Sequence, residues 1–246
     1  MMQLHKNKGS TILKPGSIIP AMTAAEATKT TEIDRDFQRN VITAIKNGDD
    51  IVFITYSAIE DTEEKIKFSL IKILEGFNRQ EIFTPVLSCI KELIANATKA
   101  NAKKILIDEG KITNPDDPVQ VVKEIRSILN EEALWEYGIK AKEKHLSTRI
   151  YLKVQNNNLI VEVINNIPLS DKELKKIGNK IEQSSKYDNI AEFYMENPDP
   201  EAEGMGLGLS MIVVLLKNID ISHKNFMVST DKRSKTYARI LVPMVH

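Results

Sequence analysis

Glu203-Gly-Met-Gly-Leu-Gly-Leu-Ser210 runs directly into the apolar stretch Met211-Ile-Val-Val-Leu-Leu-Lys217. Three of the ten glycines of the chain stand here at alternate positions, just before a pattern typical of a helix. Glycine lets the backbone approach a ligand closely and adopts positive φ without strain. The free N–H groups at the start of a helix attract anions. The stretch therefore fits either an anion-binding turn or a flexible loop before a helix. A second group of ligand-binding residues elsewhere in the chain would favour the anion-binding turn.

Composition narrows the class of protein. The 246 residues are 42% hydrophobic and 28% charged with a net charge of zero, which is typical of a globular protein and gives no electrostatic reason to bind nucleic acid or a membrane. No apolar run approaches the roughly 18 residues of a membrane span, and the N-terminus has no apolar core typical of a secretory signal. The single cysteine, Cys89, excludes an internal disulfide and a cysteine-based metal site. We therefore expect a cytoplasmic protein.

The sequence pattern of the first half of the chain predicts mostly helices. Residues 1–32 lack a sustained periodicity, and we expect them to form a loose N-terminal arm. A β-branched and aromatic run at 51–56 predicts a strand. Residues 108–148 are charged and predict one or two inserted helices. Apolar residues at helical spacing predict three further helices, over 33–47, 63–77 and 83–103.

The second half predicts a hairpin, a helix and a final pair of strands. Residues 150–154 and 159–164 flank a turn-forming cluster of asparagines. Ser170 and Glu173 have the spacing of a capping box for a helix that ends near residue 184. The acidic segment 187–203 is expected to be irregular. Two strands are expected at 226–230 and 237–242.

A polar row on the helix predicted at 83–103 supplies a candidate partner site. Glu92, Asn96 and Lys99 stand at i, i+4 and i+7, which places a carboxylate, an amide and an ammonium on one helical face. Such a row is also common on a solvated helix surface.

In this order the motifs resemble the ATP-binding domain shared by gyrases, heat-shock chaperones, histidine kinases and mismatch-repair proteins, the GHKL family. The similarity spans residues 82–243 and is greatest to the domains of histidine kinases and anti-sigma kinases. Glu203–Ser210 resembles the second glycine box of that family, Glu92–Lys99 its N-box, Ile190–Tyr194 its phenylalanine box, and Ser234–Pro243 its final strand.

The resemblance implies a fold and an organisation of the chain. The fold would be a two-layer α/β (α+β) sandwich of the Bergerat type, with a mixed β-sheet covered by helices on one face. Residues 33–246 would form this domain, with a helical insertion at 108–148, and residues 1–32 would be an N-terminal elaboration.

The resemblance also implies ATP and Mg²⁺ as ligands. Asn96 would ligate Mg²⁺, because an amide oxygen is a suitable hard ligand. Glu92 would act as, or orient, a catalytic base, and Lys99 would neutralise phosphate charge. Asn165 and Thr236 would lie near the adenine amino group. The backbone N–H groups that would surround the triphosphate belong to Gly204, Gly206, Leu207 and Gly208.

The sequence departs from the family at the first glycine box. Asn165-Asn-Ile-Pro-Leu169 stands in its place, with Ile167 and Leu169 at the positions of its glycines. The acidic segment carries six carboxylates, which would repel a triphosphate unless a metal ion or a partner screened them. No histidine lies on a helix ahead of the N-box, so we do not expect autophosphorylation. The histidines of the chain are His5, His145, His223 and His246.

Two functions are compatible with these features. The first is a stand-alone histidine-kinase-like ATP-binding domain in signal transduction, which would bind Mg-ATP and act on a partner protein as a kinase or ATPase. The alternative is a non-catalytic protein-binding module of the same fold that has lost nucleotide chemistry. Homodimerisation is left open by the sequence.

Overall fold

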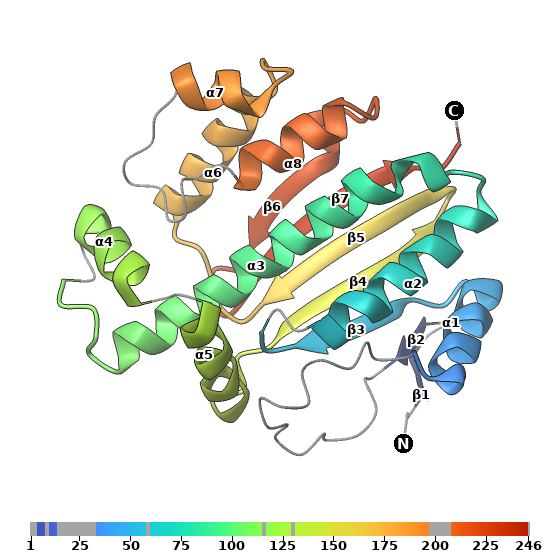
Figure 1. The fold of residues 1–246 in the computed structure, drawn as a ribbon, viewed down its shortest axis with the longest axis horizontal. Helices are drawn as coiled ribbons and strands as arrows, with labels where there is room; N and C mark the ends of the chain where they lie inside the picture. Colours follow the sequence, from blue (N-terminus) through green and yellow to red (C-terminus); the bar gives the residue numbers. More distant parts are fainter. Residues whose placement is uncertain are drawn as a thin grey trace.

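A computed structural model describes residues 4–7, 10–13, 33–57, 60–114, 117–128, 131–196 and 208–245. A five-stranded sheet forms one layer and helices cover one of its faces, as Figure 1 shows. The expected two-layer sandwich of helices on a sheet is therefore confirmed. No helix in the described ranges is long and apolar enough to cross a membrane.

The sheet is antiparallel at each of its pairings, whereas the sequence analysis expected a mixed sheet. The strand order is β3-β4-β5-β7-β6. Thr55 at the end of β3 pairs with Thr148 at the start of β4, so the helices between these strands leave and return at the same end of the sheet. That excursion makes β3 and β4 antiparallel. The strands are β3 (Ile51–Thr55), β4 (Thr148–Gln155), β5 (Asn158–Asn165), β6 (Phe226–Thr230) and β7 (Thr236–Pro243).

The β4–β5 hairpin confirms the expected turn. Asn156 and Asn157 connect the strands with φ of 50° and 57°. Positive φ at both central residues is the type I′ turn, whose twist suits a two-residue hairpin and which favours asparagine. The cluster of asparagines therefore predicts this turn from the local sequence alone.

The helical layer is organised around α3, which lies over β4 and β5 between α2 and α8 (Figure 1). This helix ends at residue 108 rather than near 103, because Ile105 and Leu106 are buried in a cluster with α4 and α5. The helices are α1 (Arg35–Asn47), α2 (Glu60–Gly76), α3 (Phe83–Asp108), α4 (Pro118–Ile128), α5 (Glu131–Glu143), α6 (Asp171–Ser184), α7 (Ile190–Glu196) and α8 (Gly208–Lys217), with 3₁₀ turns η1 (Gln80–Ile82) and η3 (His223–Asn225).

Two segments expected to lack regular structure contain short elements, and the prediction of an irregular acidic segment is wrong for residues 190–196. The N-terminal arm contains β1 (Leu4–Asn7) and β2 (Ser10–Leu13), which pair antiparallel and whose second strand reads Ser-Thr-Ile-Leu, a sequence with high β-propensity. The acidic segment contains α7, which begins where the Asn189 side chain accepts a hydrogen bond from the Ala191 N–H at 2.8 Å. Asparagine is a favoured residue at this position of a helix.

The start of α6 follows the sequence signal. The Ser170 Oγ accepts from the Glu173 N–H at 3.3 Å, and the Ser170 N–H donates to the Glu173 carboxylate at 2.8 Å. This reciprocal capping box is the one that the Ser-x-x-Glu spacing predicts. It fixes where the chain leaves the end of β5 and enters the helical layer.

Candidate functional site

The polar row of α3 meets the first residue of α8. Glu92, Asn96 and Lys99 are half-buried on one face of a continuous helix. A Cβ atom added to Gly208 would overlap the carboxylate of Glu92, closer than any van der Waals contact allows. Any larger residue at the start of α8 would displace the Glu92 carboxylate from its position in the structure. We call Glu92, Asn96, Lys99 and Gly208 the α3–α8 cluster.

Buried serines and a lysine hold α8 in this position. The Ser184 Oγ of α6 donates to the Ser210 Oγ at 2.8 Å, and both side chains are buried. At the other end of α8, the Lys217 Nζ donates to the carbonyl of Ser185 at 3.2 Å and forms an ion pair with Asp188 at 2.6 Å. The glycine motif therefore ends in a helix fixed at both ends.

Burial raises the pKa of Glu92, and the nearby Lys99 and Asn96 side chains partly oppose that shift. A carboxyl with a raised pKa is a better proton acceptor at neutral pH than an exposed one. Burial, with a smaller contribution from the Glu92 charge, raises the pKa of the neighbouring Cys89 thiol to about 12. The buried Cys89 is therefore an unreactive packing residue.

Asn96 and Lys99 each have a side-chain nitrogen that could donate a hydrogen bond to a ligand. The Asn96 Nδ2 is buried without a hydrogen-bond partner in the part of the chain that the structure describes. No ion pair or hydrogen bond joins the Lys99 Nζ to another described residue. A buried unpaired amide costs about 1–3 kcal/mol, which a ligand would offset by binding to it.

A row of five polar residues crosses the sheet at one end. Directly opposite residues on neighbouring strands share a face of the sheet, so these five side chains lie side by side. The row does not follow from any local pattern in the sequence. From one edge of the sheet to the other its members are Thr55, Thr148, Asn165, Thr236 and Thr230.

The predicted pair of Asn165 and Thr236 lies in the middle of this polar row, on adjacent strands. The Thr236 Oγ1 donates to the Ile167 carbonyl at 2.6 Å. Asn165 is only 6% exposed, and its side chain has no hydrogen-bond partner among the described residues. The two residues therefore lie side by side, but only the Thr236 side chain forms a hydrogen bond to another described residue.

The segment that replaces the first glycine box is held by internal hydrogen bonds. The Asn166 Oδ1 accepts from the Ser147 N–H at 2.8 Å and from its hydroxyl at 3.1 Å. The Leu169 N–H donates to the Thr230 Oγ1 at 3.3 Å. We call Asn165–Leu169 together with Thr236 the β5–β7 end. The Leu169 N–H, the Ile167 carbonyl and the Asn166 side chain are therefore all bonded within the fold.

The α3–α8 cluster and the β5–β7 end lie along the same helix. The Asn101 Nδ2 of α3 donates to the Leu146 carbonyl at 3.1 Å and to the Thr148 Oγ1 at 3.4 Å, and Thr148 is the cross-strand neighbour of Asn165. Nine residues of α3 separate Glu92 from Asn101, a rise of about 13 Å. An elongated ligand could therefore contact both.

Three of the predicted backbone ligands, Gly204, Gly206 and Leu207, lie outside the described residues. Within the described ranges no group of three or more His, Cys, Asp or Glu side chains could hold a metal ion. A Mg²⁺ ion would therefore need ligand oxygens beside the amide oxygen of Asn96, which is how this ion usually binds in nucleotide sites.

The acidic segment before the glycine stretch is partly neutralised. The Tyr187 hydroxyl donates to the Glu196 carboxylate at 2.7 Å, and Asp188 pairs with Lys217. Phe193, in the stretch that resembles the phenylalanine box, is 3% exposed and meets the Tyr187 ring edge-on at 5.4 Å between centroids. These contacts fix α7 next to α8.

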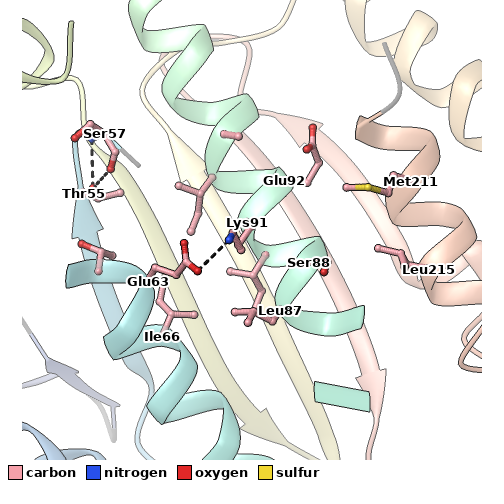
Figure 2. Close-up of a pocket in the computed structure, with 14 residues that line it drawn as sticks. Thr55, Ser57, Glu63, Ile66, Leu87, Ser88, Lys91, Glu92, Met211 and Leu215 are labelled. Atoms are coloured by element: carbon pink, nitrogen blue, oxygen red, sulfur yellow. Dashed lines mark hydrogen bonds and ion pairs between the residues drawn. The ribbon is translucent and has the colours of Figure 1, made fainter. Parts of the chain in front are cut away.

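A groove with a cavity volume of about 550 Å³ runs over α3 between α2 and α8. Glu92 and Met211 border it on the α8 side, and Glu63 and Lys91 form an ion pair of 2.9 Å across it (Figure 2). Sequence reasoning missed the groove, because it depends on how three helices pack. Its aliphatic lining includes Ile66, Leu87, Ile90, Ile94 and Leu215.

Comparisons with known proteins leave the family open. The chain is 27% identical over 195 residues to an uncharacterized protein of Treponema pallidum (strain Nichols), which covers 78% of this chain. The chain spans 37% of the length of that relative. No protein-family model matches the sequence. No solved structure matches it either.

Proposed function

We propose that this protein is a Mg²⁺–nucleoside triphosphate-binding module of the GHKL type that acts on a partner protein in signalling. The observation that carries the proposal is the α3–α8 cluster, in which the Glu92 carboxylate lies against Gly208 while the Asn96 Nδ2, one turn along α3, has no hydrogen-bond partner among the described residues. A merely solvated surface row would not be packed against the start of another helix. The buried free thiol of Cys89 suits a reducing cytoplasm.

The residues present fit the ligands that the resemblance implies. Asn96 would hold Mg²⁺, Lys99 would neutralise phosphate charge, and the N–H groups at the start of α8 would donate to phosphate oxygens. The metal ion would supply charge neutralisation on the phosphates. The raised pKa of Glu92 suits it to accept a proton from a hydroxyl group of the partner protein.

The groove of Figure 2 supports the choice of a protein substrate. It is open to solvent along α3 and reaches Glu92 at its α8 border. A partner segment bound there would place a hydroxyl group beside the carboxylate. Kinase activity would therefore depend on both the α3–α8 cluster and the groove.

The proposal is tested by the melting temperature of the full chain with Mg-ATP. A ligand that binds only the native state stabilises it by mass action, by about 2.7 kcal/mol at one hundred times its Kd. We expect a saturable rise of a few degrees with Mg-ATP and a smaller one with ATP and EDTA. An unchanged melting temperature at millimolar Mg-ATP would refute the proposal.

The groove also favours a second function, a protein-binding module without nucleotide chemistry. Its aliphatic lining and the Glu63–Lys91 ion pair could bind a partner without any reaction at Glu92. The internal bonding of the β5–β7 end agrees with a lost nucleotide site. The same melting experiment separates the two functions, since this module would not respond to Mg-ATP.

A further inference from the structure

The strand β6 forms one edge of the sheet, and no described strand pairs with its outer side (Figure 1). An edge strand presents a row of backbone N–H and C=O groups that have no partner in the sheet. Proteins usually block such an edge with a lysine, a proline or a bulge. The sequence of β6, Phe226-Met-Val-Ser-Thr230, contains no charge and no proline, and its register with β7 is regular. A further strand can therefore pair with this edge.

One flank of α6 lies along β6. Asp171 at the start of α6 forms an ion pair of 2.7 Å with Lys232, which follows β6. About three turns further along the helix, Glu182 lies 3.2 Å from the Nε2 of His223, which precedes β6. Lys175 shares this flank, because residues four apart lie on one face of a helix. A strand added to β6 would therefore run beside Lys175.

The surface around this edge is positively charged, although the net charge of the chain is zero. Residues 171–182 and 223–235 include eight lysines and arginines against four carboxylates. Each of the four carboxylates already has a partner within the fold. Five of the basic side chains, in contrast, form no hydrogen bond or ion pair with a described residue: Lys172, Lys175, Lys224, Arg233 and Lys235.

The lysines of α6 stand where helix stability does not favour them. The positive end of the helix dipole is at the N-terminus, so lysine is favoured in the last turn. In α6 three lysines lie in the first two turns and none lies in the last turn. Like charges one turn apart, such as Lys172 and Lys176, also repel each other. Local preferences are broken in this way where a function outweighs stability.

We propose that the β6 edge is the docking site for an extended acidic segment of the partner protein, which adds to the sheet as a sixth strand. The inference rests on the proposed function for the existence of a protein partner, but it does not require nucleotide. Backbone hydrogen bonds of an added strand provide affinity, and side chains at alternate positions provide specificity. The edge is separate from the groove, which lies between α2 and α8.

The two faces of β6 define the sequence pattern of the docking segment. Phe226 and Val228 face the helical layer, whereas Met227 faces the open side of the sheet and is 55% exposed. Successive side chains of a strand point to opposite faces. Acidic residues of the segment would therefore alternate with apolar ones, with the carboxylates toward Lys175 and the apolar side chains beside Met227.

The distribution of charge favours a short protein segment over a nucleic acid or a second copy of this chain. A long polyanion that followed α6 would reach α7, where Glu192 and Glu196 are exposed. Antiparallel pairing of two β6 strands about Val228 would place Lys224 of one copy opposite Lys232 of the other. Like charges directly opposite each other destabilise a sheet.

The test is calorimetric titration of the full chain with a synthetic peptide of about nine residues in which glutamate alternates with valine. We expect saturable binding that weakens at least about tenfold when serine replaces glutamate. N-methylation of alternate peptide residues removes the backbone donors on one side of the strand. Methylation of one alternate set should abolish binding, and methylation of the other set should not. Absence of saturable binding, or equal binding of both methylated peptides, would overturn the inference.

Lys175→Glu reverses one charge beside the edge, and Lys144→Glu, at an exposed position just after α5, is the matched control. We expect the Kd of the glutamate peptide to rise at least about tenfold in the first variant and to stay at the wild-type value in the control. Both variants should keep the wild-type response to Mg-ATP, since neither residue belongs to the α3–α8 cluster. Equal peptide affinity of the two variants would overturn the inference.

Further outcomes separate the occupants and the two proposals. Binding of single-stranded oligothymidine as tight as that of the peptide, or a dimer in sedimentation that the peptide does not dissociate, would assign the edge to another occupant and overturn the inference. If the wild type binds the peptide but its melting temperature does not respond to Mg-ATP, the nucleotide-binding function fails and the docking site stands.

Discussion

The α3–α8 cluster and the β5–β7 end use their polar groups in opposite ways. In the cluster, the Asn96 Nδ2 has no hydrogen-bond partner and the Lys99 Nζ has no ion-pair partner among the described residues, and Gly208 leaves room for the Glu92 carboxylate. At the β5–β7 end, hydroxyl, amide and backbone groups bond to one another across three strands. The difference separates polar groups that are available for a ligand from polar groups that hold the fold.

This contrast distinguishes the two groups of residues that resemble nucleotide-binding motifs, those of the α3–α8 cluster and those of the β5–β7 end. Glu92, Asn96, Lys99 and Gly208 are the described residues that the proposed triphosphate site would use. The residues after Asn165 carry side chains where the family that the sequence resembles has glycines, and their hydrogen bonds stabilise the corner between β5 and α6. Asn165 is the exception at this end, since no hydrogen bond joins its side chain to another described residue.

The largest effect is expected from Gly208→Ala. The new Cβ would overlap the end of the Glu92 side chain, so that carboxylate must rotate away from the start of α8. We predict a loss of no more than about 1 kcal/mol in the free energy of unfolding, because a flexible side chain can rotate, and at least a tenfold loss of Mg-ATP affinity, because the displaced carboxylate leaves its place in the cluster. Urea unfolding and calorimetry measure the two.

Gly178→Ala in α6 is the matched control for that variant, because a Cβ there meets nothing within 4 Å. It should keep the wild-type affinity and stabilise the helix by about 0.5–1 kcal/mol. If Gly208→Ala behaved like this control, the close contact between Glu92 and α8 would be wrong.

Thr236→Val tests the structural role of the β5–β7 end. The change keeps the shape of the side chain but leaves the Ile167 carbonyl without its donor. We predict a loss of about 1–2 kcal/mol of stability. Thr236→Ser keeps the hydroxyl and should lose less. Equal stability of the valine variant and the wild type in chemical unfolding would contradict the assignment of this end to the fold.

Asn96→Ala should separate ligand binding from stability. Removing an unpartnered buried amide relieves an unmet hydrogen bond, so we predict a change in unfolding free energy of no more than about 1 kcal/mol, in either direction. The rise in melting temperature with Mg-ATP should nevertheless disappear. A variant that loses stability but keeps the Mg-ATP response would show Asn96 to be structural.

The smallest effect is expected from the pH dependence of Glu92. Burial raises its pKa above the ordinary value of 4.5, so the stability that this group contributes is full below pH 4.5 and falls as the pH rises through the raised pKa. We predict that Glu92→Gln melts about 2 °C above the wild type at pH 8 and that the difference vanishes near pH 4. A difference independent of pH would mean that the Glu92 carboxyl has an ordinary pKa.

Local signals explain the parts of the structure that the sequence predicts well. The capping box of Ser170, the asparagine turn of the hairpin and the spacing of Glu92, Asn96 and Lys99 each depend on residues close together in the chain. Asn165 and Thr236, both singled out from the sequence, are cross-strand neighbours.

The parts that sequence reasoning missed depend on contacts between distant segments. The polar row takes one residue from each of five strands, and the groove forms where α2, α3 and α8 pack. β3 and β4 pair antiparallel because the long helical segment between them returns to the same end of the sheet that it left. Neither composition nor periodicity indicates which hydroxyls will be engaged and which amide will be left without a partner.

The most direct test of the difference between the two regions is a crystal structure of the full chain with Mg²⁺ and a slowly hydrolysed ATP analogue. We predict phosphate density next to Asn96, Lys99 and the start of α8, and base density next to Asn165. A nucleotide bound instead in the groove between α2 and α8, with Asn96 still unpartnered, would contradict the account.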